Sequence, residues 1–170
     1  VLSTNRKNFL KELTAAVNGE KPRKQPADKN GKPKLDAEFV ADFQFFRDYV
    51  TPEMDKVLRG DQRSCFACHG VPGRVPPLTL NPPDDAGYLP VDKLLANYRL
   101  LQFRVDLGNI EKSKLLRKPL NIQTGKEDGH QGGRRYQPMD PGYQIIRRWV
   151  LNQKKHPAKL GLEVPAKAAP

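Results

Sequence analysis

Apolar side chains recur at helical spacing along several stretches of the chain, and each such stretch predicts a helix. The first covers residues 5–17, where Phe9 and Leu13 share one face and Gly19 supplies a stop signal. Residues 18–34 lack this pattern and are rich in proline and lysine, which is typical of an exposed linker. The first helix is therefore predicted to be an appendage that docks either on the rest of the chain or on a partner.

A second apolar stretch begins after Asp36, a residue type that caps helix N-termini well. Its apolar positions are mostly aromatic and fall at helical spacing: Phe39, Val40, Phe43, Phe46, Tyr49 and Val50. Thr51 and Pro52 then predict a fresh start, with threonine as the cap and proline at the first helical position. The sequence thus predicts two consecutive helices here, the second of them ending at Gly60.

Further helices are predicted in the second half of the chain. One is capped by Asp92 and runs to about Phe103, and Ser113 caps a short segment that Pro119 breaks. The last opens at Asp140-Pro141. Its inward face is formed by Tyr143, Ile146, Trp149 and Val150. No stretch gives a convincing strand signal, so the predicted fold class is mainly α with long irregular loops.

Both cysteines of the chain lie in one pentapeptide, Cys-Phe-Ala-Cys-His at residues 65–69. Two thiols at this spacing can each add to a vinyl group of haem, and the histidine that follows is placed to coordinate the iron. We therefore predict one covalently attached haem c, with thioether bonds at Cys65 and Cys68 and with His69 as an axial ligand.

Other uses of these cysteines fit the sequence less well. A structural zinc site needs four ligands, and the remaining histidines, His130 and His156, are isolated. A thioredoxin-like pair requires a strand before it and a helix opening at the first cysteine, whereas residues 70–77 are rich in glycine and proline. A disulfide between Cys65 and Cys68 would close too small a loop to stabilise the fold much.

Three side chains compete for the iron face opposite His69. His130 lies in a glycine-rich loop, where the backbone can approach a porphyrin closely. Met139 precedes the last predicted helix, as the methionine ligand does in cytochromes of the mitochondrial type, and His156 stands in the C-terminal tail. We predict His130 as the ligand, with Met139 as the alternative and an open coordination site as a third option. Two histidines would lower the reduction potential relative to a histidine and a methionine.

Charge distinguishes the ends of the chain from its middle. The net charge is +11, and it is concentrated in residues 1–34, with nine basic and three acidic residues, and in residues 111–170, with thirteen and five. A basic protein that carries a haem is expected to dock on an acidic redox partner, and nucleic acid is not predicted as a partner. No run of 18 apolar residues predicts a transmembrane segment.

Haem c attachment needs reduced thiols and dedicated machinery, which in bacteria works outside the cytoplasmic membrane. A periplasmic or extracellular location is therefore expected. The chain opens Val-Leu-Ser, without a methionine or an apolar leader, which predicts an exported and processed chain or an excised domain.

The segment from Phe43 to Asn152 resembles the monohaem cytochrome c domains of planctomycetes and related bacteria. The resemblance depends on an apolar helix that leads to CFACHG at 65–70, on SKLLRKPL at 113–120, on GHQGGRRY at 129–136, and on DPGY at 140–143 followed by a helix ending in RWV at 148–150. It implies a helical, cytochrome c-like haem domain in which His130 is the second axial ligand. Because Arg134 and Arg135 follow this histidine directly, one of them is expected to pair with a haem propionate.

These observations predict a chain in three parts: a basic N-terminal extension (1–34), a haem domain (35–153) and a basic, flexible tail (154–170). The predicted function is single-electron transfer, either as a diffusing carrier or as a subunit of a larger redox assembly. The alternative is a haem enzyme or a gas sensor with an open or displaceable sixth ligand.

Overall fold

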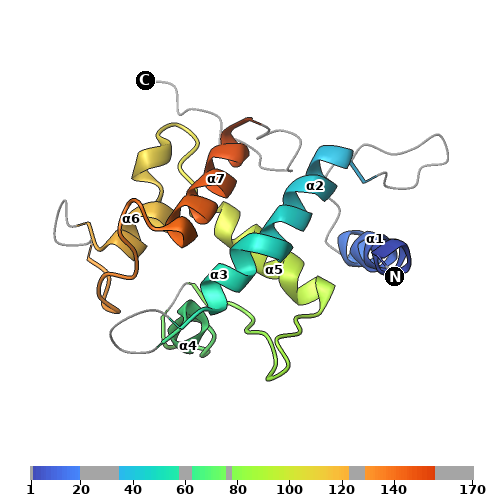
Figure 1. Cartoon of the computed structure of the whole chain (residues 1–170), viewed down its shortest axis with the longest axis horizontal. Coiled ribbons are helices and arrows are strands. Elements are labelled where there is room, and N and C mark those ends of the chain that lie inside the picture. The colour runs from blue at the N-terminus through green and yellow to red at the C-terminus, as the bar shows by residue number, and fades with distance from the viewer. Residues whose placement is uncertain (1, 20–34, 58–62, 76–77, 123–128, 156–170) are drawn as a thin grey trace.

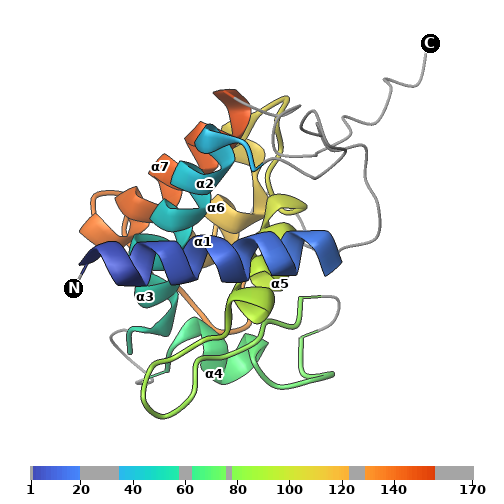
Figure 2. The same cartoon turned by 90° about the vertical axis from the view of Figure 1, so that its right-hand side faces the viewer.

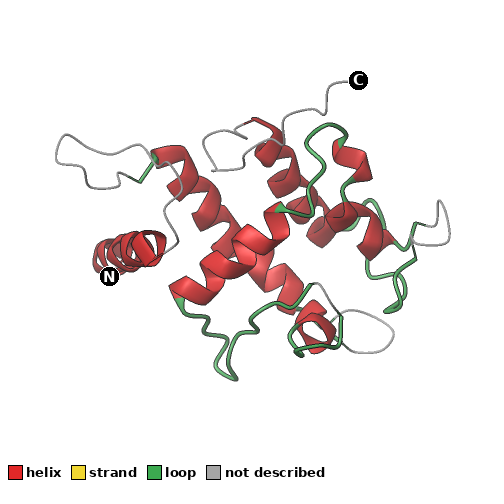
Figure 3. Cartoon of the chain, turned by 180° about the vertical axis from the view of Figure 1, so that it is seen from behind, coloured by secondary structure: helices red, strands yellow, loops and turns green. Residues whose placement is uncertain are grey.

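The computed structural model describes residues 2–19, 35–57, 63–75, 78–122 and 129–155. Within these ranges the chain forms helices joined by loops and contains no strand (Figure 3). The predicted mainly α class is therefore confirmed. None of the helices in this part of the chain is long and apolar enough to cross a membrane.

Figure 1 shows how the helices are arranged. In chain order they are α1 (Leu2–Gly19), α2 (Ala37–Phe45), the π-helical turn η1 (Phe46–Val50), α3 (Thr51–Asp55), α4 (Cys65–His69), α5 (Val91–Gln102), the 3-10 turn η2 (Ile110–Lys112), α6 (Lys114–Leu120) and α7 (Pro141–Lys155).

The segments α2, η1 and α3 form one continuous rod (Figure 1), where Thr51 and Pro52 had predicted two separate helices. The backbone stays right-handed helical through Thr51, and the wider π-helical winding of Phe46–Val50 comes just before the proline. Proline lacks an N–H and crowds the preceding turn, so locally wider winding lets the helix pass it. Thr51 therefore caps no helix: its side-chain oxygen is buried and has no hydrogen-bond partner among the described residues. The rod ends at Asp55, ahead of the predicted end at Gly60.

The core forms where this rod meets α5 and α7. Tyr98 of α5 is fully buried, and its ring makes edge contacts with four other aromatic rings at centroid distances of 5.3 to 5.9 Å. The four are Phe39, Phe43, Phe46 and Trp149. Such pairs contribute about 0.5–1.5 kcal/mol each beyond the burial of their area. The predicted aromatic stripe therefore packs the core, apart from Tyr49, which is exposed.

A single carboxylate, that of Asp42, lies inside this aromatic core. It accepts hydrogen bonds from the Tyr98 hydroxyl at 2.7 Å, Trp149 Nε1 at 3.1 Å, Gln153 Nε2 at 2.8 Å and Asn152 Nδ2 at 2.5 Å. Burial, together with the charge of Asp42, raises the pKa of Tyr98 far above its usual value, so the tyrosine stays a donor. The four donors replace the water that the carboxylate has lost, and they join α2, α5 and α7.

Helix α1 docks on this core, across α2 and α5 (Figure 2). Phe9 and Leu13 are buried, and the Phe9 ring stacks on Phe43 with centroids 6.0 Å apart. On its other side Phe9 meets the guanidinium of Arg47, 4.1 Å from the ring centroid. The first helix was predicted to dock either on the rest of the chain or on a partner. In the structure it docks on the rest of the chain.

Residues 20–34, which make up most of the predicted linker, lie outside the described residues. The predicted tail from residue 156 onward lies outside them as well. Helix α7 includes residues 154 and 155, at which the tail was predicted to begin.

Candidate haem site

The two cysteines lie on α4, a helix of one and a half turns whose ends are set by its neighbours. Ser64 caps the N-terminus, where its hydroxyl accepts a hydrogen bond from the Ala67 N–H at 3.2 Å. At the other end, a Cβ atom at position 70 would lie 2.6 Å from the Phe66 carbonyl oxygen and 3.3 Å from Pro82. Only glycine fits there, which explains why Gly70 follows the motif. Residues three positions apart are neighbours on a helix surface, so both thiols are on one face.

Both thiols are free and half-buried. Burial raises the pKa of Cys65 to about 11, although the nearby charge of Arg135 opposes the shift. Cys65 is therefore a protonated thiol at neutral pH, whereas a redox-active cysteine requires a lowered pKa. Helix α4 does begin at Cys65, as a thioredoxin-like site would require, but it is only five residues long.

A zinc site gains no support from this part of the structure. Among the described residues, no group of three or more histidine, cysteine, aspartate or glutamate side chains is placed to hold a metal ion. Four such ligands are usual for a structural zinc ion.

His69, the last residue of α4, is held in one tautomer by the chain that follows it. Its Nδ1 donates a hydrogen bond to the Leu78 carbonyl oxygen at 3.2 Å. Burial lowers the pKa of His69, and the charges of His130 and Arg104 act in the same direction, while the bond to Leu78 opposes them. The imidazole is therefore neutral at neutral pH, and Nε2 keeps a lone pair that can bind a metal. Metal-ligating histidines usually have such an Nδ1 bond to a carbonyl or carboxylate.

His130 has a corresponding hydrogen bond in a different segment of the chain. Its Nδ1 donates to the Gly133 carbonyl oxygen at 2.7 Å, so in the neutral tautomer that makes this bond Nε2 is the nitrogen with the lone pair. Its backbone N–H donates to the side-chain oxygen of Asn121 at 2.7 Å. Asn121 ends α6 in the left-handed conformation (φ 54°), which asparagine tolerates better than most residues. The end of α6 therefore fixes the position of the His130 backbone.

The structure brings the two histidines together although 60 residues separate them in the chain. Their ring centroids are 6.3 Å apart, and the ring planes are parallel within 6°. An imidazole nitrogen binds a metal at about 2.0 Å, and the ring centroid lies about 1.1 Å further out, so two imidazoles on opposite sides of one metal ion have centroids about 6.2 Å apart. The observed spacing matches this value, and parallel ring planes are one of the orientations that two axial ligands of one iron can adopt.

The competing ligands are placed differently. Met139 is 84% exposed and lies on the surface ahead of α7. His156 lies outside the described residues. This arrangement favours His130 over Met139 as the partner of His69.

The two arginines after His130 differ in their surroundings. Arg134 is exposed and its Nε donates to the Leu120 carbonyl oxygen at 3.2 Å. Arg135 is half-buried, and its charge is the largest electrostatic influence that lowers the pKa of Cys65. Pairing of either residue with a propionate stays a prediction.

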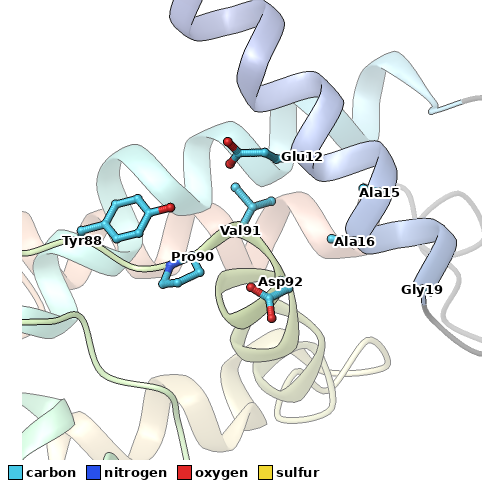
Figure 4. A pocket seen from close by; sticks show the side chains of 8 residues that line it. All are labelled: Glu12, Ala15, Ala16, Gly19, Tyr88, Pro90, Val91 and Asp92. Carbon is cyan, nitrogen blue, oxygen red and sulfur yellow. The ribbon is translucent and has the colours of Figure 1, made fainter.

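A pocket of about 600 Å³ lies elsewhere, between α1 and the start of α5 (Figure 4). Its lining includes the carboxylates of Glu12 and Asp92 and neither of the two histidines. The cysteines are also absent from this lining, so the pocket is separate from the candidate haem site.

Comparison with protein-family models, with curated protein sequences and with solved structures finds no match. The resemblance to monohaem cytochrome c domains therefore depends on the motifs of this sequence alone.

Three groups that position the histidines were not predicted from the sequence. Two are backbone carbonyls, those of Leu78 and Gly133, and because every residue has a carbonyl the sequence contains no signal for them. The third is the side chain of Asn121. An asparagine directly after a short helix is a known C-terminal signal, and it could have located the end of α6.

Proposed function

We propose that the chain binds one haem c and transfers single electrons between protein partners. The cofactor would be joined to Cys65 and Cys68 by thioether bonds, with His69 and His130 as its two axial ligands. The observation that supports this proposal best is the pair of parallel imidazole rings with centroids 6.3 Å apart, next to two cysteines on one short helix. Haem, when bound, supplies the iron that accepts and releases the electron.

The hydrogen bonds of both histidines also support the proposal. Each Nδ1 is already bonded to a backbone carbonyl oxygen, so each Nε2 is ready to bind iron without a change of tautomer. Ligands held in this way keep nearly the same geometry in both oxidation states, which favours fast electron exchange. Two protein ligands also leave no coordination position for a substrate, which favours electron transfer over catalysis on iron.

The charge of the chain suggests what kind of protein it meets. With a net charge of +11, it would associate with an acidic redox partner by electrostatic attraction. Since haem c is attached outside the cytoplasmic membrane in bacteria, we place the protein in the periplasm or outside the cell. A fixed place in a larger redox assembly is compatible with the same chemistry.

The haem itself is tested by a pyridine haemochrome assay on protein made in a host with the attachment machinery. We expect one haem c per chain that resists extraction by acidified acetone. A purified chain without haem c absorbance would refute the proposal. Carbon monoxide should not bind rapidly to the reduced protein, and rapid binding would favour the haem enzyme or gas sensor.

The axial ligand is tested by a matched pair of variants. His130→Ala should open one side of the iron, giving a high-spin component in the oxidised spectrum and new binding of carbon monoxide when reduced. Met139→Ala should leave both properties unchanged, because its side chain faces solvent. The reverse pattern would assign the ligand to Met139 and would raise the expected reduction potential.

A further inference from the structure

Carbonyl oxygens at the end of α6 bind the loop that carries His130. The last carbonyls of a helix have no intrahelical N–H to accept from, so they need donors from elsewhere. Here the loop supplies them. The Pro119 oxygen accepts from two successive backbone N–H groups of the loop, at 2.7 and 3.2 Å, and the Leu120 oxygen accepts from Arg134 Nε at 3.2 Å. The helix end and the loop therefore satisfy each other's polar groups.

Two side chains of the same helix end hold a single peptide unit of this loop. Lys118 Nζ donates to the Gly129 carbonyl oxygen at 2.8 Å, and the side-chain oxygen of Asn121 accepts from the His130 N–H at 2.7 Å. The Gly129 carbonyl and the His130 N–H belong to one planar amide, so bonds at both of them fix the orientation of that plane. The plane ends at the Cα atom of His130, and it therefore sets the direction in which the imidazole leaves the backbone.

The groups on either side of this peptide unit are fixed as well. Leu116 and Leu120 are buried, which anchors α6 in the core. On the loop side, His130 Nδ1 is bonded to the Gly133 carbonyl oxygen at 2.7 Å. With the preceding amide and the ring nitrogen both bonded, the imidazole has little freedom to turn. It is in this orientation that the ring lies parallel to that of His69.

We infer that Lys118 is a positioning residue for the proposed distal ligand: its ammonium group holds the peptide unit that directs the His130 imidazole towards the iron. The inference rests on the proposed haem and goes beyond it, because neither the pentapeptide at 65–69 nor the bonds of His130 itself include Lys118. It also gives a role to the KPL segment at residues 118–120, which the proposed function does not use. A hydrogen bond from a charged donor is stronger than one between neutral groups, so its loss should be measurable.

The expected effect concerns how often His130 leaves the iron. An iron with two protein ligands binds carbon monoxide only after one of them has dissociated. The rate of carbon monoxide binding to the reduced protein therefore reports the dissociation of the weaker ligand. Without the bond from Lys118 the peptide unit can rotate, the imidazole explores more orientations, and dissociation becomes faster.

The test compares two lysines of α6 in the haem-loaded protein. Lys118→Met keeps an unbranched apolar side chain and removes the donor, and we expect carbon monoxide to bind roughly tenfold faster, with an increased high-spin fraction in the oxidised spectrum. Lys114→Met is the matched control, because Lys114 is exposed on the same helix and its loss changes the net charge equally. Lys118→Arg keeps a charged donor and should restore most of the slow rate.

Equal binding rates for Lys118→Met and Lys114→Met would overturn the inference. A purely structural role of Lys118 would give that result too, with a lower unfolding midpoint but an unchanged spectrum. Failure of the haem proposal is recognised separately, since the wild-type protein would then lack haem c in the haemochrome assay before any rate is measured.

Should Lys118→Met fail to accumulate with haem, the same peptide unit is tested from its other side. Asn121 has φ 54°, which glycine and aspartate both tolerate. Asn121→Asp keeps the acceptor for the His130 N–H, whereas Asn121→Gly removes it. Faster carbon monoxide binding in Asn121→Gly than in Asn121→Asp would support the inference, and equal rates would overturn it.

Discussion

Gly132 is packed against the predicted iron ligand. A Cβ atom at this position would lie 3.0 Å from Cε1 of His130 and 3.2 Å from a terminal guanidinium nitrogen of Arg135. Gly132→Ala would therefore push the imidazole or the guanidinium away. In the haem-loaded protein we expect weaker His130 ligation, seen as an increased high-spin fraction in the oxidised absorption spectrum.

Gly87→Ala provides the control for this prediction. Gly87 has φ +76°, and a Cβ atom there would meet nothing within 4 Å. The substitution should cost about 1–2 kcal/mol of stability through backbone strain and leave the spectrum unchanged. Equal spectra for the two variants would contradict a role of the His130 ring in binding iron.

At the scale of helices, Asp42 joins three of them through one carboxylate. Asp42→Asn would replace an acceptor oxygen by an NH2 group that faces other donors. We expect a loss of about 2–4 kcal/mol in the free energy of unfolding, measured by urea denaturation. Tyr98→Phe removes only one of the four bonds and should cost about 1–2 kcal/mol.

Asp48→Asn is the surface counterpart of this substitution. Asp48 pairs with Arg47 at 2.6 Å in a partly exposed position. Its loss should cost less than about 1 kcal/mol, because water screens the pair. If the Asp42 and Asp48 variants were equally stable, the buried carboxylate would not hold the helices together.

Helix interiors were easier to predict than helix ends. The buried faces of α1, α2, α5 and α7 follow the apolar period of the sequence, because the same periodicity decides which side chains leave water. Among the caps, Asp36 was predicted correctly, and its carboxylate accepts from the N–H of residues 38 and 39. Asp92, by contrast, lies within the first turn of α5. Ser113 does occupy the N-cap position of α6, as predicted, but its hydroxyl accepts from the N–H of Asp106 and not from an N–H of the helix. Polar side chains can bond to several backbone groups, so local sequence does not decide which one they choose.

The π-helical turn and the candidate site were predictable only in part, because both depend on packing between segments that lie far apart in the sequence. Thr51 and Pro52 have the local pattern of a helix start, but packing of the rod against α7 keeps the helix continuous. The pentapeptide at residues 65–69 is local, so the sequence alone identified it. The sequence predicted His130 as the ligand, with Met139 as the alternative. The contact between the rings of His69 and His130 could not be predicted, because it depends on how α6 and the loop after it fold back.

For the whole molecule, the docking of α1 can be tested through Phe9. Phe9→Ala removes the stack on Phe43 and the contact with Arg47. We expect a loss of about 3 kcal/mol in the free energy of unfolding. The loss cannot exceed the whole contribution of docked α1 to that free energy, and deleting residues 1–34 measures this contribution directly.

Lys11→Ala is the matched control within the same helix. Lys11 is exposed, so its loss should change stability by no more than about 0.5 kcal/mol. A Phe9→Ala variant as stable as Lys11→Ala would contradict the docked position of α1.

The parallel orientation of the two histidine rings has a magnetic consequence for the proposed haem protein. Each axial imidazole donates π electron density into the iron d orbital that stands perpendicular to its ring. Rings that are parallel within 6° act on the same orbital and separate its energy from that of its partner. The oxidised protein should then give a rhombic low-spin electron paramagnetic resonance spectrum at low temperature, with three resolved g values. Crossed rings would leave the two orbitals nearly degenerate and give one dominant signal at large g, so this spectrum reports directly on how the loop after α6 orients His130.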